Sequence, residues 1–205
     1  MPVIAAQTCD REVVTEYSST TSRAVIQHDL TADSNIYASL SEGFKAGGYA
    51  TYECTEPYDP EEVTSLEFGF KGSLGENTSL NASLFRYDYT DFQVLQVVGI
   101  QTVTRNAGDA TVNGLELEAL TNVSDSLTLN YGVTLLDATY GDFLNTNGLE
   151  PQLGVQQLEG NYLSNAPKVS VNFGLNYTNI LSSGSSLTYR ANAAYKSKIY
   201  FSEFN

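Results

Sequence analysis

Basic side chains are scarce in this 205-residue sequence, which contains 10 lysines and arginines against 24 aspartates and glutamates. The formal net charge at pH 7 is −14. This excess of negative charge would repel a nucleic-acid backbone, and the few cations form no basic patch that could overcome the repulsion. The composition therefore argues against DNA or RNA as a partner.

Long hydrophobic runs are also missing. No apolar segment approaches the roughly 20 residues that a membrane-spanning helix requires. The amino-terminal segment lacks a charged region followed by an adequate apolar region, so we do not interpret it as a secretory signal. A membrane location would therefore depend on short strands, in which every second residue can be polar.

Cysteine and histidine are almost absent. Cys9 and Cys54 are the two cysteines, and both lie in segments that we expect to be loops. A disulfide and a pair of free thiols are both compatible with this pattern. His28 is the one histidine and has no neighbouring cysteine or second histidine, so we expect no metal shell. No nucleophile elbow is present either, and we expect no catalytic residue, no cofactor and no enzyme activity.

Strict alternation of apolar and polar residues is the main positive feature. In the segment 169–178, V-S-V-N-F-G-L-N-Y-T, every odd-numbered residue is apolar and every even-numbered residue is polar and uncharged. Because successive side chains of a strand point to opposite faces, such a strand separates two environments. Eight strand-like segments, at 18–30, 34–47, 61–73, 78–98, 110–122, 126–141, 166–180 and 185–201, predict an all-β, antiparallel up-and-down meander.

The connections between these segments alternate in length. Tight polar turns are expected near 31–34, 74–78, 122–125 and 181–184, and longer loops at about 48–60, 99–109 and 142–165. Short turns at one end and long loops at the other are typical of outer-membrane barrels. The pattern therefore favours the strands of a transmembrane β-barrel.

Charged residues test which face would meet lipid. Glu67 and Lys71 oppose Leu66, Phe68 and Phe70, and Glu116 and Glu118 likewise oppose their apolar neighbours. The charges thus fall on the face that would line a lumen, although the solvated face of a soluble sheet would alternate in the same way. Within 79–98 the apolar parity changes, which predicts a bulge, or the end of the lipid-facing zone, near residues 84–86.

Aromatic residues in or beside the long loops are candidates for capturing a planar or hydrophobic ligand, with an aromatic girdle and loop packing as the alternative explanation. Two cations could contact an anionic ligand. The acidic loop 53–62 suggests calcium, but it lacks the spacing of an EF-hand, and a solvated loop explains it better. The candidate ligand-contacting residues are Tyr49, Tyr52, Tyr58, Arg105, Tyr140, Phe143, Tyr162 and Lys168.

Six segments, in order along the chain, resemble the barrel of TonB-dependent outer-membrane receptors. They are N-I-Y-A-S-L-S-E-G-F-K-A-G-G-Y at 35–49, Y-D-P-E-E-V-T-S-L-E-F-G-F-K at 58–71, S-L-F-R-Y-D-Y-T-D-F-Q-V at 83–94, R-N-A-G-D-A-T-V-N-G-L-E-L-E at 105–118, L-S-N-A-P-K at 163–168 and Y-K-S-K-I-Y-F-S-E-F-N at 195–205. The resemblance covers nearly the whole chain after Tyr17. Nothing in the sequence resembles the plug domain or the TonB box of that family.

The resemblance implies a bacterial outer-membrane location and a barrel of about 22 strands, of which this chain supplies a part. Residues 1–205 are expected to be a partial barrel domain, with 1–17 as an extracellular loop remnant and with the plug and the carboxyl-terminal strands absent. The implied function is uptake of an iron–siderophore complex or a similar scarce nutrient, energised through TonB. The implied partners are outer-membrane lipid, the TonB complex and a metal chelate or other small nutrient. A chain without a plug should not transport on its own.

Two alternatives belong to other functional classes. A complete eight-stranded barrel with a structural or adhesive role would close on itself. A soluble β-sandwich that binds a ligand would need a second sheet over the first.

Overall fold

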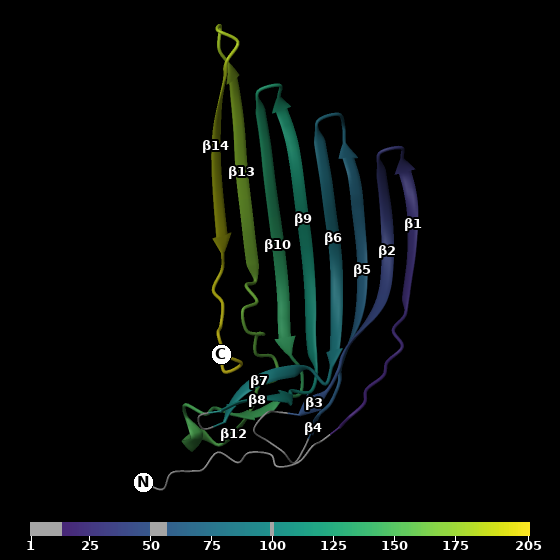
Figure 1. The fold of residues 1–205 in the computed structure, drawn as a ribbon, viewed down its shortest axis with the longest axis vertical. Coiled ribbons are helices and arrows are strands. Elements are labelled where there is room, and N and C mark those ends of the chain that lie inside the picture. Colours follow the sequence, from purple (N-terminus) through teal and green to yellow (C-terminus); the bar gives the residue numbers. More distant parts are fainter. Residues whose placement is uncertain (1–13, 50–56, 99–100) are drawn as a thin grey trace.

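The computed structural model describes residues 14–49, 57–98 and 101–205. Its main element is one eight-stranded sheet in the order β1-β2-β5-β6-β9-β10-β13-β14, in which every neighbouring pair is antiparallel (Figure 1). The strands follow the predicted segments closely. They are β1 Arg23–Thr31, β2 Ser34–Lys45, β5 Glu61–Leu74, β6 Thr78–Thr90, β9 Ala110–Ser124, β10 Leu127–Tyr140, β13 Val169–Ile180 and β14 Ser186–Lys196.

The short turns and the long loops lie at opposite ends of the sheet (Figure 1). The long loops contain three two-stranded ladders: β3 Gly48–Tyr49 with β4 Pro57–Tyr58, β7 Gln93–Val98 with β8 Gln101–Asn106, and β11 Leu144–Thr146 with β12 Val155–Gln157. A single 3-10 turn, η1 Pro151–Leu153, connects β11 to β12. The predicted asymmetry is confirmed, and the long-loop end is more ordered than the sequence indicated.

The predicted bulge near residues 84–86 is wrong. β6 pairs with β5 and with β9 through this region without a shift of register. The strand instead ends at Thr90, and Asp91 follows with a φ of 52°. The change of parity therefore marks the end of the apolar zone on an unbroken strand, which was the other prediction.

The sheet is open. β1 and β14 are its two edges, and the other sheets formed by the described residues are the two-stranded ladders at the loop end (Figure 1). A closed eight-stranded barrel would pair β1 with β14, and a sandwich would cover one face with a second large sheet. The structure therefore contradicts both alternatives.

Candidate functional site: two faces and a loop end

The register joins the apolar residues of separate strands into one surface. Phe68 lies opposite Leu84, Leu84 opposite Leu115, Leu115 opposite Leu135, and Leu135 opposite Val169. Phe68 and Leu84 are 51% and 57% exposed. Large apolar side chains exposed over so wide an area indicate a surface that contacts an apolar environment. We call this surface the apolar face.

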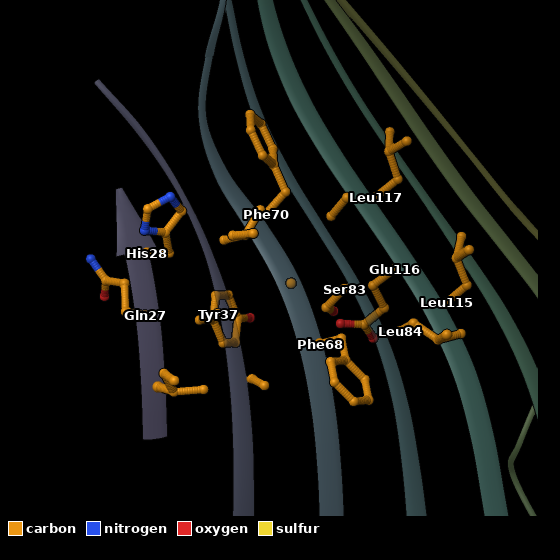
Figure 2. A pocket seen from close by; sticks show the side chains of 15 residues that line it. Gln27, His28, Tyr37, Phe68, Phe70, Ser83, Leu84, Leu115, Glu116 and Leu117 are labelled. Carbon is orange, nitrogen blue, oxygen red and sulfur yellow. The ribbon is translucent and has the colours of Figure 1, made fainter. Parts of the chain in front are cut away.

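A shallow groove of about 610 Å³ lies on the apolar face. Figure 2 shows Phe68, Phe70, Leu84, Leu115 and Leu117 around it, from β5, β6 and β9. Ala38 and Ala82 leave the space between these larger side chains, and His28 lies at the edge, opposite Ile36 of β2. Because the lining is mainly apolar, the groove has few groups that could recognise a polar nutrient.

The opposite, polar face carries the charges. Lys71 lies opposite Asn81, and Asn81 opposite Glu118. The Tyr37 hydroxyl group donates a hydrogen bond to Glu67, and Lys71 Nζ lies 5.1 Å from the centre of the Tyr37 ring. The predicted separation of charged and apolar residues is confirmed.

Aromatic rings cover glycines on the polar face. The Phe85 ring lies over Gly114, and the Tyr37 ring lies over Gly69 on the neighbouring strand. A Cβ atom at either glycine would overlap with the ring above it. Gly114 is therefore a close-packed position of the wall, where a side chain would displace Phe85.

A small hydrophobic core holds the loop end together. It consists of Val94, Ala107, Tyr140, Phe143 and Leu158, with Tyr140 and Phe143 only 5% and 6% exposed. The ring centres of Tyr140 and Phe143 lie 5.2 Å apart. We call this group the loop core. Tyr140 packs inside it, and contact of Tyr140 with a ligand stays a prediction.

Two side-chain amides tie the loops to each other. Asn106 Nδ2 donates to the carbonyl oxygens of Asp59 (3.0 Å) and Asp91 (2.6 Å), and its Oδ1 accepts from the Asp59 N–H (2.7 Å). Gln93 Nε2 donates to Ala46 and Asp59 carbonyl oxygens. The sequence analysis missed both residues, because their partners are distant in sequence and no local period marks them.

The structure separates the predicted ligand-contacting residues into several places. Tyr49 and Tyr58 belong to the β3–β4 ladder, whereas Tyr52, Cys9 and Cys54 lie outside the described residues. Arg105 and Phe143 line a common cavity of about 640 Å³ at the loop end. Sequence reasoning did not foresee this pairing, because Arg105 of β8 and Phe143 of the loop after β10 are distant in sequence.

Tyr162 and Lys168 form a separate stack with Tyr200 and Lys198. Lys168 Nζ lies 3.9 Å from the centre of the Tyr162 ring. The Tyr162 and Tyr200 rings are stacked with their centres 6.1 Å apart, and Lys198 Nζ lies 4.3 Å from the centre of the Tyr200 ring. The Tyr162 hydroxyl group accepts a hydrogen bond from Lys168 and raises the pKa of its ammonium group. The sequence analysis did not identify Lys198 or Tyr200 as candidate site residues.

Metal-binding chemistry has no support among the residues that the structure describes, where no group of three histidine, cysteine, aspartate or glutamate side chains is placed to hold an ion. Across the same described ranges, no helix is long and apolar enough to cross a membrane.

The sequence profile of the TonB-dependent receptor-like β-barrel family matches residues 6–204. The chain belongs to this family. TonB-dependent receptor barrels lie in the bacterial outer membrane, and the family consists of receptors and transporters. The apolar and polar faces of the sheet are the two sides of such a wall.

Two named receptors, one of them matched both by sequence and by structure, illustrate the relationship. The probable TonB-dependent siderophore receptor PiuA of Acinetobacter baumannii is 31% identical over 147 residues, which are 69% of this chain and 18% of that protein. The crystal structure of the ferric yersiniabactin uptake receptor FyuA from Yersinia pestis matches with a TM-score of 0.70 and 19% identity, over 88% of this chain and 26% of the receptor. The crystal structure of the siderophore receptor PiuA from Acinetobacter baumannii matches with a TM-score of 0.64 and 24% identity, over 87% of this chain and 26% of that one. The chain thus spans less than a third of the length of these receptors.

Proposed function

We propose that this chain forms part of the wall of an outer-membrane receptor that takes up a metal–siderophore complex or a similar scarce nutrient, energised through TonB. The observation that carries the proposal is the continuous apolar face, which spans separate strands and lies opposite a charged face. PiuA is named as a siderophore receptor and FyuA as a ferric yersiniabactin uptake receptor, which supports this nutrient class.

The rest of the receptor comes from other segments under this proposal. Residues 1–205 form a partial barrel domain, residues 1–17 belong to an extracellular loop, and a plug domain and further strands complete the protein. The short share of each similar receptor that the chain covers, 18% to 26%, supports this division. The edges β1 and β14 then pair with neighbouring strands of the closed barrel.

The location of the two faces can be tested by cysteine labelling. Ser83 and Leu84 are adjacent on β6 and therefore point to opposite faces. In the receptor with Cys9 and Cys54 replaced by serine, Ser83→Cys should react with a water-soluble maleimide in intact outer membranes. Leu84→Cys should react only with a lipid-soluble maleimide. Equal labelling of both positions by the water-soluble reagent would contradict the assignment of faces.

Uptake can be tested in a strain that lacks the gene and carries it on a plasmid. Accumulation of radioactive iron supplied with a panel of siderophores should depend on the plasmid and should stop when TonB is deleted. Accumulation that continues without TonB would show that the protein is not an energised receptor. A TonB-independent porin expressed in the same strain serves as the control for the outer membrane.

A further inference from the structure

The sequence contains two Asn-Gly pairs, and the structure places them in opposite surroundings. Asn113-Gly114 lies within β9, in the middle of the sheet, whereas Asn147-Gly148 lies at the loop end, between β11 and η1. Glycine has no Cβ atom, so its backbone nitrogen is less hindered than that of any other residue. An asparagine before a glycine is therefore the one whose side-chain amide a backbone nitrogen can attack most readily.

The reaction in question is loss of ammonia from the asparagine side chain. The glycine nitrogen gives its proton to a base in the solvent and forms a bond to the asparagine Cγ atom, while the Cγ–Nδ2 bond breaks and Nδ2 leaves as ammonia. The product is a five-membered succinimide ring. Water then opens the ring at one of its two carbonyl carbons, which leaves aspartate with either the original backbone linkage or an isoaspartyl linkage through Cγ. The net change is hydrolysis of an amide, so neither an oxidant nor a reductant takes part.

The Asn147-Gly148 pair is open to the base and the water that this reaction needs. Gly148 is exposed, Leu149 is 93% exposed, and residues 146–149 line a cavity of about 480 Å³ at the loop end. The Leu149 N–H donates a hydrogen bond to Asn147 Oδ1 at 3.0 Å. Because Oδ1 becomes negatively charged when a nitrogen attacks Cγ, the Leu149 N–H is placed to stabilise the developing charge.

The Asn113-Gly114 pair is held in the sheet. β9 lies between β6 and β10, so its backbone N–H groups point toward one partner strand or the other. Gly114 is buried, pairs with Phe85 and Leu136, and lies beneath the Phe85 ring. The Gly114 nitrogen could attack Asn113 Cγ only after the backbone had left the ladder and the ring had moved.

Asn145 shows that a place in the same loop is not sufficient for the reaction. Its side chain is 5% exposed; Nδ2 donates to Glu203 Oε1 at 2.9 Å, and Oδ1 accepts from the Thr146 N–H at 2.7 Å. Thr146, whose nitrogen would have to attack, has a branched Cβ atom and pairs with Val155 in the β11–β12 ladder. Asn145 is therefore an internal control two residues away from Asn147.

We propose that Asn147 is a site of spontaneous deamidation in the folded protein and that the sheet protects Asn113 from the same reaction. The inference goes beyond the proposed function and does not depend on it, because it requires neither a ligand nor TonB. The product places a new carboxylate close in sequence to Glu150, and the isoaspartyl form also adds a carbon atom to the main chain between β11 and η1. The loop end of an aged protein thus differs in charge and in backbone from that of a newly made one.

The rates at the three asparagines test the proposal. The whole receptor is purified in detergent and incubated in mildly alkaline buffer made with heavy-oxygen water, which labels every carboxylate formed during the incubation. Proteolysis in ordinary water and mass spectrometry then give the labelled fraction at each asparagine over time. Asn147 should react about tenfold or more faster than Asn113, because the ladder must open before Asn113 can react. Asn145 should stay unlabelled, and the labelled Asn147 peptide should separate into aspartyl and isoaspartyl forms.

Two variants and one change of conditions isolate the cause. Asn147→Gln keeps an amide but would have to form a larger ring, so no labelled acid should appear at this position. Gly148→Ala adds a Cβ atom beside the attacking nitrogen and should slow the reaction at Asn147 about tenfold. Unfolding of the wild type in urea removes the sheet and should bring Asn113 and Asn147 to similar rates, because both precede glycine.

Several results would overturn the proposal. They are similar rates at Asn113 and Asn147 in the folded receptor, no label at Asn147 over an incubation that labels the unfolded chain, and an unchanged rate in Gly148→Ala. A slow reaction at Asn113 after unfolding would show that the sheet is not what protects it. None of these results changes outer-membrane location or TonB-dependent uptake, so the proposed function is tested separately.

Discussion

Tyr37 and Phe85 show how single residues build the polar face. Each places its ring over a glycine of the neighbouring strand, at Gly69 and Gly114 respectively. The glycine leaves a space on the sheet surface, and the ring fills it. The ring thereby covers the backbone of the strand at a position that has no side chain of its own. The packing of the wall here depends on the ring and the glycine together, so a substitution of either residue should disturb the packing of the other.

Gly114→Val should destabilise the protein by about 1–3 kcal/mol, because the added side chain would force the Phe85 ring out of its position. The free energy of unfolding in urea, followed by the heat-dependent shift of the folded band on a gel, measures the effect. Ala194→Val, on the exposed edge strand β14, is the control and should change little. Adding Phe85→Ala to Gly114→Val should recover part of the loss.

Asn106→Ala should loosen the loop end, because it removes three hydrogen bonds that join β8 to Asp59 and Asp91. The expected loss of stability is about 1–3 kcal/mol. Limited proteolysis should cut the long loops of this variant faster than those of the wild type. Asn179→Ala, near the short-turn end of β13, should not change the rate of loop cleavage; equal acceleration by both variants would contradict a local role for Asn106.

Each strand separates the apolar environment on one side of the sheet from the polar environment on the other. β5, β6, β9 and β10 contain 14, 13, 15 and 14 residues, more than the roughly 9–11 that cross the hydrocarbon layer. They extend beyond the membrane, and the change from apolar to polar residues after Leu84 on β6 lies on such an extension. Depth in the bilayer, and not a break of the strand, explains the parity change.

Leu84→Lys and Ser83→Lys test the two faces of β6 with adjacent positions. Because Leu84 lies near the end of the apolar zone, a lysine there should cost less than the about 2–4 kcal/mol expected at the bilayer midplane, whereas a lysine on the lumen side remains in a polar environment. We expect less folded receptor in the outer membrane for Leu84→Lys, measured by quantitative immunoblot of unheated samples. Ser83→Lys should assemble nearly as well as the wild type, and the reverse order would show that the faces are exchanged.

The whole molecule is an open sheet with an ordered cluster of loops at one end. The edges β1 and β14 expose backbone groups that a neighbouring strand could pair with. At the loop end, the loop core and the amides of Gln93 and Asn106 hold together segments that are distant in sequence. Under the proposed function, other strands of the receptor pair with these two edges and close the barrel.

Association through β14 can be tested with proline. The Ser197 N–H donates to the Val169 carbonyl oxygen at 2.9 Å. Because the ladder alternates, the Ala193 N–H then points toward β13 and the Ala194 N–H toward the open edge. Ala194→Pro should therefore reduce self-association of the isolated chain in detergent, as measured by analytical ultracentrifugation. Ala193→Pro should instead break the ladder with β13 and destabilise the strand; equal effects of both would contradict pairing through this edge.

The sequence alone determined the strands, the two faces and the asymmetry of turns and loops. These features are local: the strand period of two places each residue of 169–178 on a face, and the charges Glu67, Lys71, Glu116 and Glu118 follow the same rule. The parity change near Leu84 could not be assigned locally, because only pairing with β5 and β9 excluded a bulge.

Only the tertiary structure decided that the sheet is open and which loop residues meet. Arg105 and Phe143 line one cavity, whereas Tyr162 and Lys168 stack with Tyr200 elsewhere. The physical reason is that loop contacts come from side-chain packing and hydrogen bonds between segments far apart in sequence, for which no periodic pattern exists. The alternation of a strand is imposed by its own backbone, but the position of a loop is imposed by its partners.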